Sequence, residues 1–155
     1  MRRTTFYNIH KNLGAKIVEF AGFEMPIQYS SILAEHKAVR NSVGVFDVSH
    51  MGEVFVKGKQ ALDFVQHITV NDASKLFPGR VQYSAMCYPD GGIVDDLLVY
   101  KISDREYLLV INASNIEKDF NWMKENNKFG VTLNNRSDDY SLLAVQGPNS
   151  GEVLK

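Results

Sequence analysis

The sequence predicts an α+β fold in which antiparallel sheets carry helices packed on one face. Two strand-like runs, 81–88 and 93–102, are joined by Pro89-Asp90-Gly91-Gly92, a composition typical of a hairpin turn. Another polar turn leads into a third strand-like run at 107–112. Helical periodicity precedes and follows these strands, so the order from Glu53 onward reads β-α-β-β-β-α-β. This order is similar in plan to a ferredoxin-like unit.

The first predicted helix lies ahead of that unit. Ser30 or Ser31 caps its amino terminus, the helix runs to about Ser42, and Gly44 ends it. Three of its apolar side chains are expected to face inward: Ile32, Ala38 and Val39.

The predicted ferredoxin-like unit opens with an alternating strand at 53–57 and a helix at 59–68, followed by a loop at 72–79. The inward side of this helix is marked by apolar residues at near-helical spacing: Leu62, Val65 and Ile68.

A second helix is predicted after the three strands. The stretch Ser114-Asn115-Ile116-Glu117 has the pattern of a capping box, and apolar residues follow at helical intervals. Strands at 131–134 and 141–145 complete the order. The last six residues, SGEVLK, look like a helix that stops after one turn, which indicates either a frayed end or the front part of a longer protein.

Composition excludes several classes of function. The chain has 155 residues, enough for one domain or two small ones, and its formal charge of −1 disfavours nucleic acid and anionic membranes as partners. Cys87 is the only cysteine, so neither an intrachain disulfide nor a cysteine-rich metal site can form. No apolar run is long enough to span a bilayer. We therefore expect a cytoplasmic protein.

The stretch GGIVDDLLVYK, residues 91–101, places two carboxylates in an otherwise apolar strand. Strand side chains alternate between faces, so Asp95 shares its face with Lys101, near the end of the strand where water is expected. Asp96 shares its face with Leu98 and Tyr100 and with no other charge. A carboxylate on an apolar face costs free energy unless it is hydrogen-bonded or paired. Asp96 is therefore the candidate catalytic residue.

The hairpin defines what surrounds Asp96. If the loop has an even number of residues, Ala85 lies opposite Asp96 and Tyr83 lies diagonally across from it. An odd loop would instead place Ser84 and Met86 on that face. A structural role for Asp96, as an acceptor of backbone N–H bonds at a bulge, stays open at this point.

Other chemistries have weaker support. The histidines fall at no metal-ligand spacing, and the side chains of Asp95 and Asp96 are expected to point to opposite faces, so no metal is predicted. Gly91-Gly92 lacks the pattern of a phosphate-binding or dinucleotide-binding loop, and Cys87 has no base nearby in sequence.

Five motifs in one order carry a family resemblance: FAGFEMPIQY, SVGVFDVSHMGE, GGIVDDLLVYK, NASNIEKDFNW and AVQGPN. With them the chain resembles the aminomethyltransferase of the glycine cleavage system, the T-protein, over its whole length. The resemblance implies that tetrahydrofolate is the co-substrate and that the lipoylated H-protein is the partner that delivers an aminomethyl group. The products would be 5,10-methylenetetrahydrofolate, ammonia and dihydrolipoyl H-protein.

The resemblance also implies roles for particular residues. The family's aspartate in GG-x-x-DD falls on Asp96, which would contact the reactive pteridine region as proton acceptor or electrostatic positioner. Six further residues would line the folate pocket: Met51, Tyr83, Leu98, Tyr100, Val110 and Asn112.

Members of the family continue well past residue 155, so we expect the chain to be the N-terminal portion of the folate-binding region. Residues 51–138 would form the ferredoxin-like subdomain, and 1–50 with 139–155 part of a second, incomplete one. Such a chain is expected to be inactive alone and to self-associate through uncovered apolar surface. Two alternatives stay open: the folate-binding domain of a dimethylglycine or sarcosine oxidase, and a non-enzymatic folate-binding module.

Overall fold

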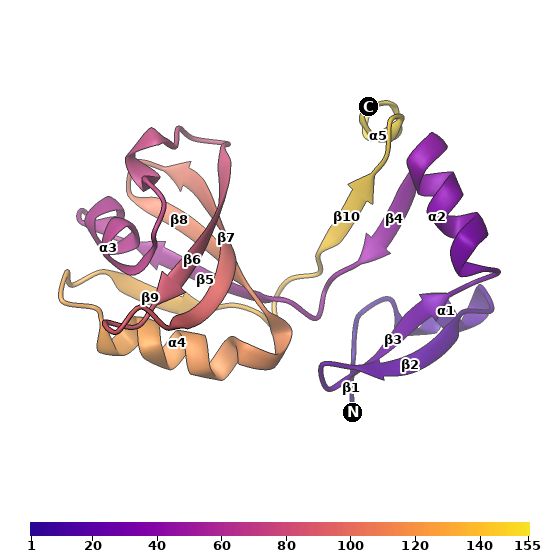
Figure 1. The fold of residues 1–155 in the computed structure, drawn as a ribbon, viewed down its shortest axis with the longest axis horizontal. Helices are drawn as coiled ribbons and strands as arrows, with labels where there is room; N and C mark the ends of the chain where they lie inside the picture. Colours follow the sequence, from indigo (N-terminus) through magenta and orange to yellow (C-terminus); the bar gives the residue numbers. More distant parts are fainter. The chain divides into compact units, whose positions relative to one another are not determined.

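A computed structural model describes residues 1–155, which divide into two compact units. Met51–Tyr140 forms the first, here called the continuous unit, and Met1–His50 with Ser141–Lys155 forms the second, the split unit. The predicted subdomain limit at residue 138 lies just before Tyr140. Figure 1 shows the elements of each unit along the chain.

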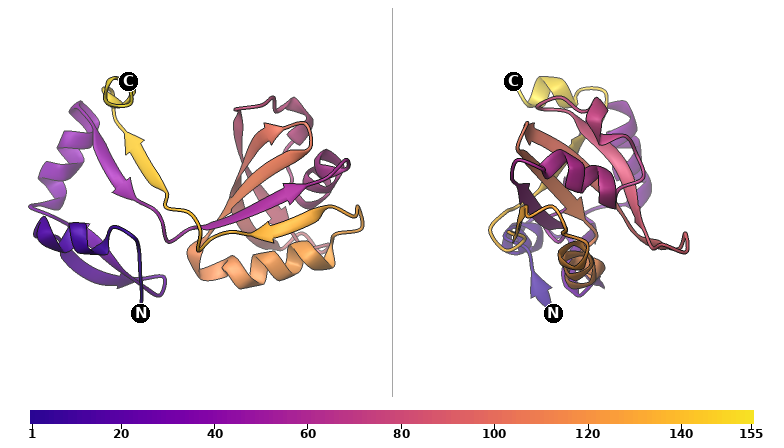
Figure 2. Two further views of the ribbon diagram at one scale, coloured as in Figure 1. Left: turned by 180° about the vertical axis from the view of Figure 1, so that it is seen from behind. Right: turned by 90° about the vertical axis from the view of Figure 1, so that its left-hand side faces the viewer.

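The continuous unit contains the predicted β-α-β-β-β-α-β order, and the α+β fold class is confirmed. Every pairing in its five-stranded sheet is antiparallel, and the spatial order is β6-β7-β8-β5-β9, with β9 at one edge beside β5 (Figure 2). Two short 3-10 turns, η1 (Ala73–Lys75) and η2 (Ala113–Asn115), interrupt the connections. The elements are β5 (Gly52–Lys57), α3 (Ala61–Ile68), β6 (Val81–Cys87), β7 (Ile93–Ser103), β8 (Glu106–Ile111), α4 (Ile116–Glu125) and β9 (Thr132–Asn135).

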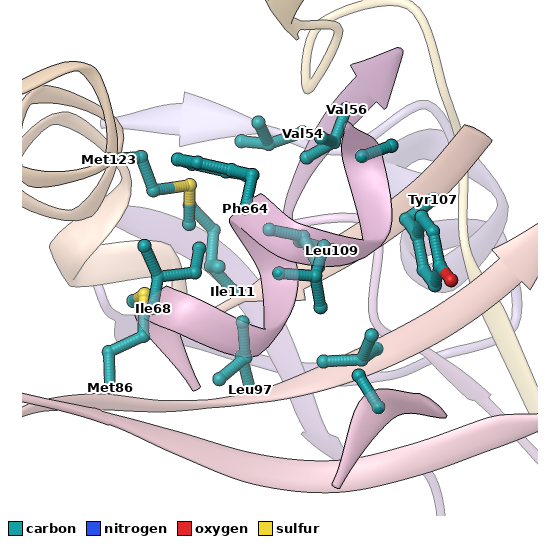
Figure 3. Close-up of a cluster of buried hydrophobic side chains, with 14 of the residues drawn as sticks. Val54, Val56, Phe64, Ile68, Met86, Leu97, Tyr107, Leu109, Ile111 and Met123 are labelled. Carbon is teal, nitrogen blue, oxygen red and sulfur yellow. The ribbon is translucent and has the colours of Figure 1, made fainter. Parts of the chain in front are cut away.

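Both helices of the continuous unit pack on one face of this sheet. Phe64 and Ile68 from α3 and Met123 from α4 are almost completely buried against alternate residues of the strands (Figure 3). The strand residues in this core have the period of two that a sheet face requires: Val54 and Val56, Leu97 and Val99, Leu109 and Ile111. The opposite face is here called the helix-free face.

The predicted capping box of α4 is wrong. Asn115 is the N-cap residue, its side chain makes no capping bond, and Ser114 lies in the η2 turn. The amide of Asn115 instead donates to Asp95 Oδ2 at 2.9 Å. The Asn115 side chain is therefore bonded to the buried carboxylate of Asp95 on β7 and does not cap the helix.

The split unit is built from two small sheets and three helices. In the first sheet β3 lies between β1, which is parallel to it, and β2, which is antiparallel; in the second, β4 pairs with β10. The elements are β1 (Arg2–Arg3), α1 (Tyr7–Asn12), β2 (Lys16–Phe20), β3 (Phe23–Gln28), α2 (Ile32–Asn41), β4 (Gly44–Asp47), β10 (Leu143–Gln146) and α5 (Ser150–Val153).

For α2, the predicted cap is confirmed and the predicted burial is wrong. Ser31 accepts a hydrogen bond from the backbone of Ala34, as an N-cap residue should. No residue of α2 is buried, and Ile32 is 58% exposed. Gly44 begins β4 rather than ending the helix, whose C-cap is Ser42. A Cβ at Gly44 would overlap Val39, which accounts for a glycine at this position. None of the helices has the length and apolar character needed to cross a membrane.

Candidate functional site

The register of the sheet brings the predicted site residues together on the helix-free face. Ala85 pairs with Asp96, which confirms the even-loop register, and a bulge between Met86 and Cys87 interrupts the ladder only beyond that point. Extending the ladders by one residue places Asn112 beside Asp96 and Met51 beside Asn112. The next row along the same face runs Tyr83, Leu98, Val110 and Glu53.

Asp96 is half-buried and is held by two side chains. Tyr83 donates its hydroxyl to Asp96 Oδ2 at 2.7 Å, from the diagonal position that the register predicts. This hydrogen bond is the largest cause of a raised pKa for Tyr83, and desolvation of the hydroxyl raises the pKa further. The Tyr83 ring is itself 63% exposed, so the hydroxyl that fixes Asp96 belongs to a side chain that a ligand can reach.

Asn112 provides the second contact. Its side-chain amide donates to Asp96 Oδ1 at 2.9 Å and to Asp95 Oδ1 at 3.0 Å. The carboxylates of Asp95 and Asp96 therefore share one donor, although neighbouring strand residues were expected to point apart. The shared donor lies one residue beyond the end of β8, at the rim of the sheet, where both faces are within its reach.

The expectation that Asp95 lies near water is wrong. Asp95 is 8% exposed and lies on the helix-covered face, where Asn115 and the backbone N–H of Asp96 also donate to it. Burial acts to raise its pKa, but the hydrogen bonds outweigh burial and hold the pKa of Asp95 below the ordinary value. Lys101 forms its ion pair with Asp104 instead, at 3.1 Å.

The remaining predicted pocket residues form an apolar surface around Asp96. Leu98 and Tyr100 follow it along β7 and are half-buried, as is Met51, whereas Val110 on β8 is 3% exposed. A flat, largely apolar surface with a few polar anchors suits an aromatic ring system better than a small charged molecule.

Glu53 is a residue of this face that sequence reasoning missed. It is 2% exposed, neither carboxylate oxygen has a hydrogen-bond partner, and burial raises its pKa to about 7. The alternation of EVFVK offered a signal, because it places Glu53 on the same face as the half-buried Phe55. A carboxyl group in such surroundings carries its proton up to neutral pH.

Nothing on this face resembles a metal centre. No group of three or more histidine, cysteine, aspartate or glutamate side chains is placed to hold a metal ion. Cys87 is a half-buried free thiol. The polar groups that the fold gathers around Asp96 are a phenol and an amide, which orient a carboxylate.

Comparison with known proteins identifies what this arrangement resembles. The family model described as the GCVT N-terminal domain matches residues 6–155. An aminomethyltransferase of Flavobacterium psychrophilum is 57% identical over 155 residues, and one of Bacillus subtilis is 55% identical; each match covers 100% of this chain and 43% of the relative. A crystal structure of the glycine cleavage system aminomethyltransferase T from Bartonella henselae superposes with a TM-score of 0.88 at 33% identity, covering 99% of this chain and 42% of that one. The chain thus spans less than half the length of these relatives.

Proposed function

Because the chain belongs to the GCVT N-terminal domain family, we propose that it supplies the folate-contacting face of an aminomethyltransferase of glycine cleavage. The donor is an aminomethyl group on the lipoyl arm of the H-protein. Tetrahydrofolate accepts the methylene carbon, and the products are 5,10-methylenetetrahydrofolate, ammonia and dihydrolipoyl H-protein.

Asp96 is the residue proposed to act on the reacting atoms. A folate nitrogen that attacks the methylene carbon becomes positively charged and then loses its proton as ammonia departs. An anionic carboxylate beside that nitrogen accepts the proton or stabilises the charge. The bonds from Tyr83 and Asn112 support either role, because both fix the orientation of the carboxylate.

The apolar residues around Asp96 are proposed to bind the pterin. Leu98 offers half-buried apolar surface beside Asp96, with Tyr100 along β7 and Met51 beyond Asn112. Val110, which is 3% exposed, lies beside Leu98 in the same cross-strand row and would support it. Burying a ring system against such a surface contributes about 25 cal/mol per Å² of apolar area. These residues would therefore supply affinity for the pterin, and Asp96 would take part in the reaction.

The observation that carries this proposal is the Asp96 carboxylate held between Tyr83 and Asn112 on the helix-free face. It is tested by assaying ammonia release from aminomethyl-loaded H-protein, with tetrahydrofolate binding measured separately, in the protein that carries this sequence. Asp96→Asn keeps the size of the side chain and removes its charge. The transfer rate should fall by about 10²-fold or more, as for loss of a group that handles a proton, while folate binding changes much less.

Asp104→Asn is the matched control. It removes an exposed carboxyl just beyond β7 and should leave the transfer rate unchanged. An Asp96→Asn variant with the rate and binding of the unaltered protein would show that Asp96 has no part in the reaction.

The same proposal includes the lipoylated H-protein as the partner of this protein and the cytoplasm as its location.

A further inference from the structure

A second carboxyl group lies beneath the candidate site, on the helix-covered face of the sheet. Asp119 on α4 is 0% exposed, and neither of its oxygens receives a hydrogen bond. The nearest cation, Lys118 Nζ, is 3.6 Å from Asp119 Oδ1 and donates instead to the carbonyl of Val94 at 2.5 Å. An ionised carboxylate in this position would have almost nothing to offset its desolvation.

Asp95 on β7 is also buried but has the opposite surroundings. Its Oδ1 accepts from Asn112 and from the backbone N–H of Asp96, each at 3.0 Å. Asn115, the N-cap residue one turn before Asp119 on α4, donates to Asp95 Oδ2 at 2.9 Å, so Asp119 lies on the side of α4 that faces Asp95. Two ionised carboxylates cannot hydrogen-bond to each other, because both are acceptors. If Asp119 carries a proton, its O–H becomes a donor to Asp95, and the interaction between the two groups becomes favourable.

We propose that a protonated Asp119 carboxyl group donates a hydrogen bond to Asp95, so that the pair acts as a positioning device for the Asn112 amide and, through it, for Asp96. The proposed bond from Asp119 to Asp95 would extend two observed contacts, from Asn112 to Asp95 Oδ1 at 3.0 Å and from Asn112 to Asp96 Oδ1 at 2.9 Å. Together these contacts would pass from the helix-covered face to the helix-free face around the rim of the sheet.

The charges around Asp119 support this assignment of the proton. Burial is the largest influence on its pKa and the interaction with Asp95 the next, and together they raise the pKa of Asp119 to about 7. Asp95 from β7 and Lys118 from α4 itself are the charged groups that act on it. The opposing effect of Lys118 is weaker, since that ammonium points to Val94. Ionising Asp119 would place a second negative charge next to Asp95. The repulsion would displace the Asp95 carboxylate and weaken its hydrogen bond with Asn112.

The role in positioning Asp96 for catalysis rests on the proposed function, whereas the proton on Asp119 does not. The proton can be observed directly by NMR of the full chain with ¹³C-labelled aspartate carboxyl groups. At pH 6 one aspartate resonance should have the chemical shift of a protonated carboxyl, and it should titrate near pH 7. Asp119→Asn should remove that resonance, and Asp63→Asn, which removes an exposed carboxyl on α3, should leave it in place. Aspartate resonances that all have the ionised shift at pH 6 would overturn the assignment.

Two substitutions test positioning without any assay of activity. Asp119→Asn keeps an N–H donor facing Asp95, so the side-chain NH₂ resonances of Asn112 should keep their shifts. Asp119→Ala removes the donor, so those resonances should move or broaden.

In the transfer assay, Asp119→Asn should stay within about threefold of the unaltered rate and lose any inflection near pH 7, whereas Asp119→Ala should lower kcat about tenfold with KM little changed. An Asp119→Ala variant with unaltered Asn112 resonances would refute the positioning role.

Discussion

The two units of this chain are stabilised by different kinds of interaction. In the continuous unit, side chains from both helices and four strands form one buried apolar cluster. In the split unit only Tyr7, Phe23 and Met25 are buried apolar residues, and a hydrogen-bonded chain links separate elements instead. Tyr29 contacts His10 at 2.7 Å, and His10 contacts Asp47 at 2.8 Å.

This difference shows that an amphipathic pattern predicts a face but not whether that face is covered. The apolar side of α2 has the spacing of an inward face, yet Ile32 and Leu33 are 58% and 73% exposed. The apolar side of α4 has a similar spacing, and Met123 is fully buried. Helical periodicity is local, whereas burial needs a partner surface that the periodicity does not specify.

The largest expected effect comes from removing one ring in each unit. Phe64→Ala empties part of the core of the continuous unit and should lower its free energy of unfolding by about 3–5 kcal/mol. Phe46→Ala removes a ring that is 44% exposed in the split unit and should cost well under half as much. Urea unfolding monitored by Trp122, the only tryptophan, reports on the continuous unit, and the urea dependence of hydrogen exchange in β4 reports on the split unit. Equal losses from the two substitutions would mean that the units do not differ in packing.

The second prediction concerns pH, which should shift the stability of the two units in opposite directions. Burial raises the pKa of Glu53 and of Asp119 to about 7, so between about pH 4 and 7 the unfolded state releases protons that the folded continuous unit retains. Its stability should therefore fall as pH rises through this window, by up to about 1.4 kcal/mol per pH unit for each group. Glu53→Gln should flatten this slope.

The split unit should respond in the other sense. Burial lowers the pKa of His50, so stability is lost as pH falls below about 6.5, where the unfolded histidine takes up a proton. Burial acts to raise the pKa of Asp47, but hydrogen bonds from His10, Thr4 and Ser49 outweigh it and leave the pKa lowered, so its contribution is lost below about pH 4. Hydrogen exchange in β4 and β5, corrected for intrinsic rates, compares the units; parallel pH profiles would contradict the prediction.

A smaller effect is expected from the exposed apolar side chains of the split unit. Ile27, Ile32 and Phe46 border a hollow of about 230 Å³ and are 52%, 58% and 44% exposed. We expect the chain to self-associate through this surface at high concentration. Ile32→Glu should weaken association about tenfold, since one buried aliphatic side chain is worth about 1.5–3 kcal/mol.

Sedimentation equilibrium measures this association. Val70→Glu is the control, because Val70 is 60% exposed in the continuous unit and should not affect the association constant. A chain that sediments as a monomer at all concentrations would rule out an associating surface.

Sequence reasoning placed the strands of the continuous unit within one or two residues, because strong turn signals separate them. The hairpin at Asp90-Gly91 is such a signal, and φ is +89° at Gly91. It also placed Asp96 and Tyr83 on one face. The burial of Asp95 and the role of Asn115 were missed, since they depend on how closely the η2 turn approaches β7, and alternation along a strand carries no such information.

No helix or strand was predicted ahead of Ser30, for a different reason. The β2–β3 hairpin turns at Ala21-Gly22, where φ is +51° and +83°, and FAGF offers only one glycine as a local turn signal. The short helix α1 has no side-chain cap and only six residues, so its sequence carries little local evidence. Its position depends on His10, whose partners are Tyr29, one residue after β3, and Asp47 of β4.

The pairing of β4 with β10 has a consequence for synthesis on the ribosome. Next to this pair, Ser49 and Leu142 exchange hydrogen bonds and are 93 residues apart in the chain. At about 5–20 residues per second, roughly 5–20 s separate the emergence of the two partners. All of Met51–Tyr140 emerges within that interval, and a mixed domain of its size folds in about a second or less. During synthesis β4 therefore stays unpaired until β10 emerges. In this period the unpaired edge of β4 is the part of the split unit that a chaperone would bind.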